Sequence, residues 1–191
     1  MPPKANFNKR LVMESALELV REKGMEAISA RAISTKLGCS TRPLYSLYED
    51  MEKLIEDLLQ YANQYFGRHL EDFSKREKLV ENDFMKFGLA YIDFAKTETN
   101  LFKMLFLSNS FNASGFSDLV SPVDHAFILD SIPGSSSEAK NEKELQRHFL
   151  DVWIYTHGMA VMAAFGGVDF SHAEVIQMLT HASKSLSATS E

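Results

Sequence analysis

The stretch ARAISTKLGCSTRPLYSLYE, residues 30–49, predicts two short helices joined by a tight turn. Ile33 and Leu37 lie one helical turn apart and mark the inner side of the first helix. Gly38 ends that helix at a position where a positive φ favours glycine. Leu44 faces the same core from the second helix, so the stretch has the pattern of a helix-turn-helix.

The outer side of the second helix is polar. A proline is tolerated in the first turn of a helix, where no backbone N–H is needed, but it disfavours helical dihedral angles at the preceding residue. Because of Pro43, we expect this helix to span residues 43–48, with Arg42 just before it. Apolar side chains inside and short polar ones outside are what a helix needs to read the DNA major groove. The polar side chains are Ser40, Thr41, Arg42, Tyr45 and Ser46.

The candidate contacts to DNA are of two kinds, since base edges carry specificity while phosphates give register and affinity. For bases we favour Arg42, which can pair with both major-groove acceptors of guanine, with Thr41 and Ser40 beside it. Arg31 can reach a groove edge or a phosphate. Any of these side chains can instead be an ordinary surface or packing residue, because exposed charges often contribute little. The expected phosphate contacts are Ser29, Tyr45, Tyr48 and either Lys9 or Arg10.

Composition separates a basic N-terminal part from an acidic remainder. The chain of 191 residues has a formal net charge of −6, yet residues 1–48 carry eight Lys and Arg against four Glu. A basic head on an acidic body suits a DNA-binding protein that avoids non-specific adhesion. Hydrophobic residues make up 45% of the chain, without an apolar run long enough to cross a membrane. The lack of a signal-peptide pattern and the single cysteine favour the cytoplasm.

The rest of the chain has helical periodicity without strand-like alternation, so we expect an all-α protein of about nine helices. Ser29 and Asn100 are each expected to cap a helix, and Gly24 and the pair Gly166 and Gly167 are each expected to end one. Ser171 and Glu174 have the spacing of a capping box. A loop is expected at residues 109–118 and a Ser-rich linker at 133–137. The other helices are predicted at residues 8–23, 51–73, 83–96, 101–108, 122–132, 138–165 and from 172 onward.

Three segments, ALELVREKG (16–24), ISARAISTKLGCS (28–40) and LYSLYEDMEKLI (44–55), resemble the tetracycline-repressor (TetR) family of transcriptional regulators. The resemblance implies a three-helix DNA-binding head with a helix-turn-helix, at residues 1–50. It also implies a larger helical bundle, at residues 51–191, that binds an effector and forms a homodimer. In that family the fourth helix joins the two parts and transmits the state of the effector pocket to the head.

The segment DVWIYTHGMAVMAA, residues 151–164, resembles the Trp-x3-His-Gly pattern of one C-terminal subgroup of the family, and LFKMLF fits the same subgroup. Two positions depart from the family. Met51 stands where a phosphate-binding lysine is frequent, and Pro43 where a small hydroxyl residue is frequent. The resemblance implies a ligand-responsive repressor that binds a near-palindromic operator as a homodimer. We expect the last two helices of each subunit to form a four-helix interface about a two-fold axis.

Aromatic and methionine side chains are abundant in the C-terminal part, which suits a pocket for a small apolar or aromatic effector with a few polar anchors. Trp153 and His157 are four residues apart and share one helix face. Phe94 and Phe102 are the next pocket candidates. Such stripes are more often core than pocket, and His157 can equally be a hydrogen-bonded core histidine.

Other classes of function have weaker support. The histidines and the cysteine lack the spacing of a metal site, and the sequence has no nucleophile elbow or phosphate-binding glycine loop. We therefore expect no enzyme, no metal and no cofactor. The main alternative is an all-α interaction or dimerisation module without operator binding, which Met51 and Pro43 favour. A small-molecule carrier or a helical enzyme that uses the aromatic C-terminal part is a second alternative.

Overall fold

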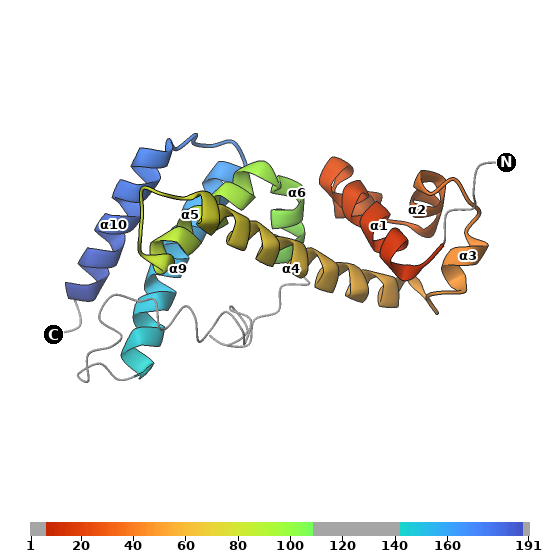
Figure 1. The fold of residues 1–191 in the computed structure, drawn as a ribbon, viewed down its shortest axis with the longest axis horizontal. Coiled ribbons are helices and arrows are strands. Elements are labelled where there is room, and N and C mark those ends of the chain that lie inside the picture. The colour runs from red at the N-terminus through yellow and green to blue at the C-terminus, as the bar shows by residue number, and fades with distance from the viewer. Residues whose placement is uncertain (1–6, 109–141, 189–191) are drawn as a thin grey trace. The chain divides into compact units, whose positions relative to one another are not determined.

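All regular secondary structure in the described part of the chain is helical, which confirms the predicted all-α class (Figure 1). The computed structural model describes residues 7–108 and 142–188. The predicted loop 109–118, helix 122–132 and linker 133–137 lie outside these described residues. Within them, no helix is both long and apolar enough to span a membrane. The elements are α1 Lys9–Lys23, the 3-10 turn η1 Met25–Ala27, α2 Ala30–Lys36, α3 Arg42–Tyr45, α4 Met51–Arg76, α5 Asp83–Thr97, α6 Thr99–Phe102, the π-helical turn η2 Lys103–Leu107, α9 Glu142–Ala164 and α10 His172–Ala188.

Contacts divide the chain into two compact units. The first comprises Met1–Gly67 and Glu98–Ser110, and the second comprises Arg68–Thr97 and Phe111–Glu191. α4 therefore begins in the first unit and ends in the second, while α6 and η2 belong to the first unit together with α1, α2 and α3. The predicted division at residue 50 separates a DNA-binding domain from an effector-binding domain by function. The division by contacts does not test it, so it stays a prediction.

In the first unit, α1 buries one apolar face. Val12 and Val20, which lie on the same side of the helix, have no exposed surface. Asn8 caps the start of α1 by accepting a hydrogen bond at 2.9 Å from the backbone N–H three residues later. Gly24, with a φ of +84°, ends it. The helix predicted at residues 8–23 is therefore confirmed.

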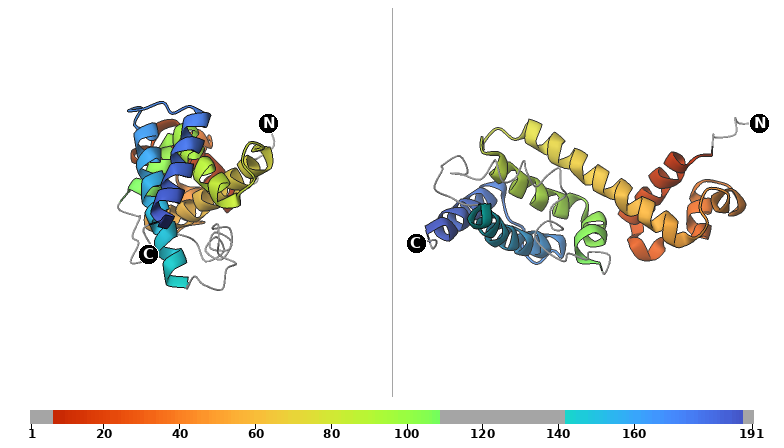
Figure 2. Two further views of the ribbon diagram at one scale, coloured as in Figure 1. Left: turned by 90° about the vertical axis from the view of Figure 1, so that its left-hand side faces the viewer. Right: turned by 90° about the horizontal axis from the view of Figure 1, so that it is seen from below.

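In the second unit, α5 packs against α9 and α10, and the three helices lie side by side in both views of Figure 2. Gly88 of α5 is buried at this contact. A Cβ at Gly88 would lie 3.0 Å from Leu179 Cδ1 of α10 and 3.7 Å from Thr156 Cγ2 of α9. The glycine therefore allows the α5 backbone to approach both neighbours closely. Tyr91 and Phe94, farther along α5, are fully buried in the same unit.

The short helix after α5 starts earlier than predicted. Asn100 was expected to be its N-cap, but α6 begins at Thr99 and includes Asn100. The Asn100 side-chain amide instead donates to the backbone oxygen of Arg21 at 2.9 Å. This oxygen lies in the last turn of α1, where the helix has no later N–H groups to satisfy its carbonyls. The side chain therefore serves the end of a different helix.

The predicted C-terminal end of α9 and the predicted start of α10 are confirmed, while the predicted start of the former helix at residue 138 lies outside the described residues. Gly166, with a φ of +69°, and Gly167 donate to carbonyl groups in the last turn of α9, which is the Schellman pattern. α10 opens with the capping box. The Ser171 N–H and hydroxyl donate to Glu174 Oε2 at 2.9 Å and 2.6 Å, and the Glu174 N–H donates to Ser171 Oγ at 3.3 Å.

We expect Glu174→Gln to remove a pH-dependent contribution to stability. Hydrogen bonds from the Ser171 hydroxyl and backbone lower the pKa of Glu174 below its ordinary value of 4.5. Folding therefore favours the ionised carboxylate, so the stabilisation is complete above the unfolded-state pKa and is lost as the pH falls through the lower folded-state value. Urea unfolding should show the wild type more stable than Glu174→Gln at neutral pH, with a difference that shrinks steadily below pH 4.5.

The partner side of the capping box provides the control for this prediction. Ser171→Ala should weaken the same pH dependence without abolishing it, because the hydroxyl donor is lost while the backbone N–H remains. A difference between wild type and Glu174→Gln that is constant across the acid range would contradict the assignment of the pKa shift to this capping box.

Candidate nucleic-acid interface

The helix-turn-helix predicted at residues 30–49 is present in the first unit as α2, a turn and α3 (Figure 1). Ser29 caps α2 as predicted, because its Oγ accepts from the Ala32 N–H at 3.1 Å. Gly38 has a φ of +66°, and its N–H and that of Cys39 donate to carbonyls in the last turn of α2 at 3.1 Å and 3.0 Å. This Schellman pattern closes α2 and turns the chain towards α3.

α3 begins one residue earlier than predicted and is shorter. The expectation that Pro43 keeps Arg42 out of the helix is wrong, because α3 runs from Arg42 to Tyr45. The Thr41 carbonyl accepts from the N–H groups of Leu44 and Tyr45. Pro43 occupies the second helical position, where the missing N–H leaves no helical hydrogen bond unmade. Arg42 therefore belongs to the first turn of α3 and not to an extended segment before it.

Most of the predicted DNA contacts lie at the surface. The exposed ones are Ser29, Arg31, Ser40, Arg42 and Tyr45, and Thr41 is half-buried. Tyr45 is 53% exposed, although a tyrosine ring usually gains from burial. Among the described residues, neither Arg31 nor Arg42 has an ion-pair partner. Both guanidinium groups are therefore available to a phosphate or to a base edge.

Tyr48 does not belong to this exposed face. Its side chain is 4% exposed and its hydroxyl is buried. Burial raises the pKa of Tyr48 to about 12, and the charge of Asp57 acts in the same direction. The Lys9 Nζ lies 4.7 Å from the centroid of the Tyr48 ring and 3.0 Å from Asp57 Oδ2. Tyr48 packs in the core of the first unit, so the exposed face does not include it.

Ion pairs attach the helix-turn-helix to α1. The Lys36 ammonium of α2 lies 3.0 Å from Glu22 Oε1 and 3.2 Å from Glu18 Oε2, both on α1. The hydrogen bond to Glu22 is the first cause that raises the pKa of Lys36, so the lysine stays charged at neutral pH. Lys36 therefore serves the packing of the head, whereas Arg31 on the same helix is unpaired among the described residues.

The position at the start of α4 has no phosphate-binding lysine. Met51 is its first residue and is half-buried. Asp50 caps the helix by accepting from the Lys53 N–H at 2.8 Å. The Lys53 ammonium lies 2.8 Å from Glu56 Oε2, along the same helix. Lys53 is therefore paired with a neighbouring carboxylate. It does not replace the phosphate-binding lysine that the family often has at the position of Met51.

The tentative effector residues are only partly brought together. Trp153 and His157 stack on one face of α9, with ring centroids 4.9 Å apart and ring planes at 15°. The Tyr91 hydroxyl lies 2.8 Å from His157 Nδ1. Burial lowers the pKa of His157 and raises that of Tyr91, so this hydrogen bond joins a neutral tyrosine and a neutral imidazole. Phe94 is fully buried in the second unit, and Phe102 is fully buried in the first.

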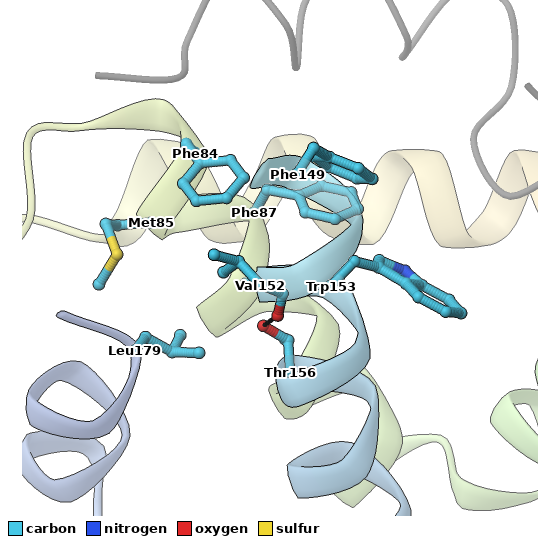
Figure 3. A pocket seen from close by; sticks show the side chains of 9 residues that line it. Phe84, Met85, Phe87, Phe149, Val152, Trp153, Thr156 and Leu179 are labelled. Atoms are coloured by element: carbon cyan, nitrogen blue, oxygen red, sulfur yellow. Dashed lines mark hydrogen bonds between the residues drawn. The ribbon is translucent and has the colours of Figure 1, made fainter. Parts of the chain in front are cut away.

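A pocket in the second unit lies beside Trp153, between α5, α9 and α10 (Figure 3). Its cavity volume is about 10 Å³, room for about one water molecule, so an effector could enter only if the lining side chains moved apart. The Thr156 hydroxyl donates to the Val152 carbonyl at 2.8 Å, which leaves a largely apolar wall. The lining residues are Phe84, Met85, Phe87, Gly88, Phe149, Val152, Trp153, Thr156 and Leu179.

This lining includes residues that the sequence analysis missed. Phe149 lies four positions before Trp153 and Thr156 three positions after it, so helical spacing from Trp153 could have found both, whereas Val152, directly before Trp153, gives no such signal. His157 and Phe94 do not line this pocket. No group of three His, Cys, Asp or Glu side chains in the described part of the chain is placed to hold a metal ion.

Two solved structures share this fold. The crystal structure of a TetR-like transcriptional regulator from Rhodococcus sp. RHA1 matches with a TM-score of 0.63 and 13% identity, over 95% of this chain and 96% of that chain. The crystal structure of the multidrug binding protein EbrR complexed with imidazole matches with a TM-score of 0.56 and 11% identity, over 95% and 97%. No protein-family model and no curated protein matches the sequence.

These likenesses define the class of fold. The chain has the all-α fold of TetR-like regulators, with a helix-turn-helix in its first unit and a helical body in its second. The resemblance that residues 10–59 carry in sequence is thus matched by a likeness in fold. The finer resemblance of residues 151–164 to the Trp-x3-His-Gly subgroup stays a prediction.

Proposed function

We propose that this protein is a sequence-specific DNA-binding transcriptional regulator without enzymatic activity. In detail, we propose a cytoplasmic, ligand-responsive repressor that acts as a homodimer on a near-palindromic operator. The observation that carries the proposal is the helix-turn-helix whose second helix exposes Arg42 in its first turn, within the fold of a TetR-like regulator. The N-terminal turns of a recognition helix are the part that contacts base edges.

The proposed contacts to DNA are of two kinds, contacts to base edges and contacts to phosphates. Arg42 is the base contact, because a guanidinium can donate to O6 and N7 of one guanine. Ser40 and Thr41, just before it, add contacts to a base or a thymine methyl group. Tyr45 and Arg31 are the proposed phosphate contacts, since both are exposed on the head. Ser29 offers its hydroxyl, which is exposed at the start of α2.

An exposed apolar stripe supports the proposed homodimer. The stripe consists of two residues of α9 and the residue directly after it, and their exposed fractions are 57% for Ile154, 43% for Met162 and 64% for Phe165. Their spacing places them on one side of the helix. Gly158 lies between them, and a Cβ there would meet no atom within 4 Å. A partner helix can therefore approach closely at Gly158. Two heads related by a two-fold axis would meet half-sites roughly 34–36 Å apart.

The pocket beside Trp153 supports the proposed effector site. Its apolar and aromatic lining suits a small apolar or aromatic molecule, and the solved EbrR, which shares the fold, is described as a multidrug binding protein. An effector would act by binding more tightly to the conformation that does not bind DNA, because equal affinity for both conformations shifts nothing. In this proposal Trp153 contacts the effector and His157 orients the Trp153 ring by stacking on it.

Selection of bound duplexes from a random DNA library tests the proposed function directly. We expect one enriched site with two-fold symmetry, and fluorescence anisotropy on that site should show affinity falling steeply with salt, with a logarithmic slope of about −0.9 per phosphate contact. An enriched site without symmetry would contradict the homodimer. If no sequence is enriched even at low salt, operator binding fails and the interaction module becomes the leading interpretation.

A further inference from the structure

A carboxylate at the start of α6 joins three helices of the first unit. Glu98 accepts from Arg21 Nε at 2.7 Å and from Arg21 Nη2 at 2.5 Å, so the guanidinium of α1 is bound in a two-pronged geometry. The Tyr65 hydroxyl of α4 donates to Glu98 Oε1 at 2.9 Å. The Glu98 side chain is only 11% exposed. A planar fork on a sheltered carboxylate fixes both distance and orientation, which a lysine in the same place would not do.

The same segment holds Arg21 at its backbone as well. The Asn100 amide donates to the Arg21 carbonyl at 2.9 Å, and the Tyr65 ring lies beneath the guanidinium, 5.4 Å from Cζ to ring centroid. One residue of α1 is therefore held at its side chain by Glu98 and at its carbonyl by Asn100. These contacts fix the C-terminal end of α1 relative to the first turn of α6.

The held end of α1 also carries the helix-turn-helix. Glu22, the residue after Arg21, pairs with Lys36 of α2 at 3.0 Å, and Glu18 pairs with the same ammonium at 3.2 Å. Arg21 and Glu22 are consecutive in α1, and the first pairs with Glu98 while the second pairs with Lys36 of α2. A shift of α1 at Arg21 would move the anchor of α2, and with it the position of α3.

Glu98 also occupies a boundary in the chain. α5 ends at Thr97, and the backbone of Glu98, with φ −123° and ψ 47°, interrupts the helix before α6 begins. The division between the two compact units falls between these same two residues. Glu98 is therefore joined by one peptide bond to the last residue of α5.

We propose that Glu98 is a positioning residue for DNA binding, which sets the placement of the helix-turn-helix through Arg21 and α1. This inference rests on the proposed function. It states that the ion pair between Arg21 and Glu98 controls how well the head binds DNA. When the pair is made, the head is in the DNA-binding arrangement. When the pair is broken, α1 is released and the fraction of molecules competent for DNA falls, so the apparent dissociation constant rises in inverse proportion to that fraction.

The test compares Glu98→Gln, Arg21→Gln and the double variant with the wild type on the operator selected by the wild type. Each single variant should bind that operator about tenfold more weakly, and the double variant should lose no more than either single one, because both substitutions remove the same pair. The salt slope of binding should stay at the wild-type value, since Glu98 contacts no phosphate in this proposal. Tyr65→Phe, which removes only one hydrogen bond, should give a smaller loss.

The matched control is Glu71→Gln, an exposed carboxylate on α4 whose ion pair among the described residues is with Lys75 of the same helix, at 3.7 Å. It should bind the operator as the wild type does. Urea unfolding of every variant checks that all are folded under the binding conditions. If the folded Glu98→Gln and Tyr65→Phe variants bind with wild-type or tighter affinity, the pair is merely structural and this inference is overturned. If the wild type itself selects no DNA, the proposed function fails, and this inference fails with it.

Discussion

Replacing Phe94 by alanine is expected to lower the free energy of unfolding by about 3–5 kcal/mol. Phe94 has no exposed surface, and its ring lies edge-on to that of His69, with centroids 5.2 Å apart, within the second unit. Truncation removes the transfer free energy of the ring and leaves a cavity that the packed side chains around it can only partly close. Urea unfolding followed by circular dichroism, at one fixed protein concentration, measures the change.

The Phe94 experiment separates a core residue from a pocket residue. A side chain that lines an open effector pocket can be truncated at small cost, because one of its sides already faces free space. Leu79→Ala is the control, since Leu79 is 78% exposed and its loss should change the unfolding free energy by no more than about 0.5 kcal/mol. A loss below about 1 kcal/mol for Phe94→Ala would contradict its assignment to the core and restore Phe94 as a pocket candidate.

Replacing Arg42 by alanine is expected to remove sequence discrimination at one base pair of each half-site. A two-pronged contact from arginine to guanine contributes roughly 1–3 kcal/mol against a wrong base. Arg42 is exposed in the first turn of α3 and has no ion-pair partner among the described residues, so the substitution disturbs no internal contact of the head that the structure describes. Anisotropy on the selected site and on single-base variants of it should show the wild-type preference at that position disappearing.

Two further variants distinguish a base contact from a phosphate contact. Tyr45→Phe should weaken binding to all these duplexes by a similar factor, worth about 1 kcal/mol, because the hydroxyl would bind the backbone and not a base. Lys75→Ala, near the C-terminal end of α4 in the second unit, should leave specific binding unchanged. If Arg42→Ala retains the full preference at every position, then Arg42 is an ordinary surface residue and another side chain reads the site.

Local sequence signals predicted the ends of the helices well. Ser29 and Ser171 accept the hydrogen bonds that their types and positions indicated, and Gly24, Gly38 and Gly166 take the positive φ values that end helices. These features succeed because both partners lie within a few residues of each other, so sequence spacing alone determines whether they can meet. The all-α class follows from apolar periodicity for the same reason.

The sequence signal failed where a hydrogen bond of the folded chain opposed a local preference. Pro43 disfavours helical dihedral angles at the residue before it, yet α3 begins at Arg42 because the Thr41 carbonyl accepts two of the following N–H groups. Asn100 is a good capping residue by type, but its amide serves the Arg21 carbonyl of α1. In both cases a hydrogen bond available in the folded chain outweighs a statistical preference.

The sequence by itself determined the helix-turn-helix, the polar character of its outer face and the basic charge of the head, because each depends on residues close together in the chain. Only the tertiary structure decided that Tyr48 is buried while Tyr45 is exposed, and that Phe94 and Phe102 are core residues. It also brought Arg21 and Glu98, 77 positions apart in sequence, into hydrogen-bond contact. Burial and long-range pairing depend on which helix faces meet, and that choice is made by the packing of the whole chain, which no single segment specifies.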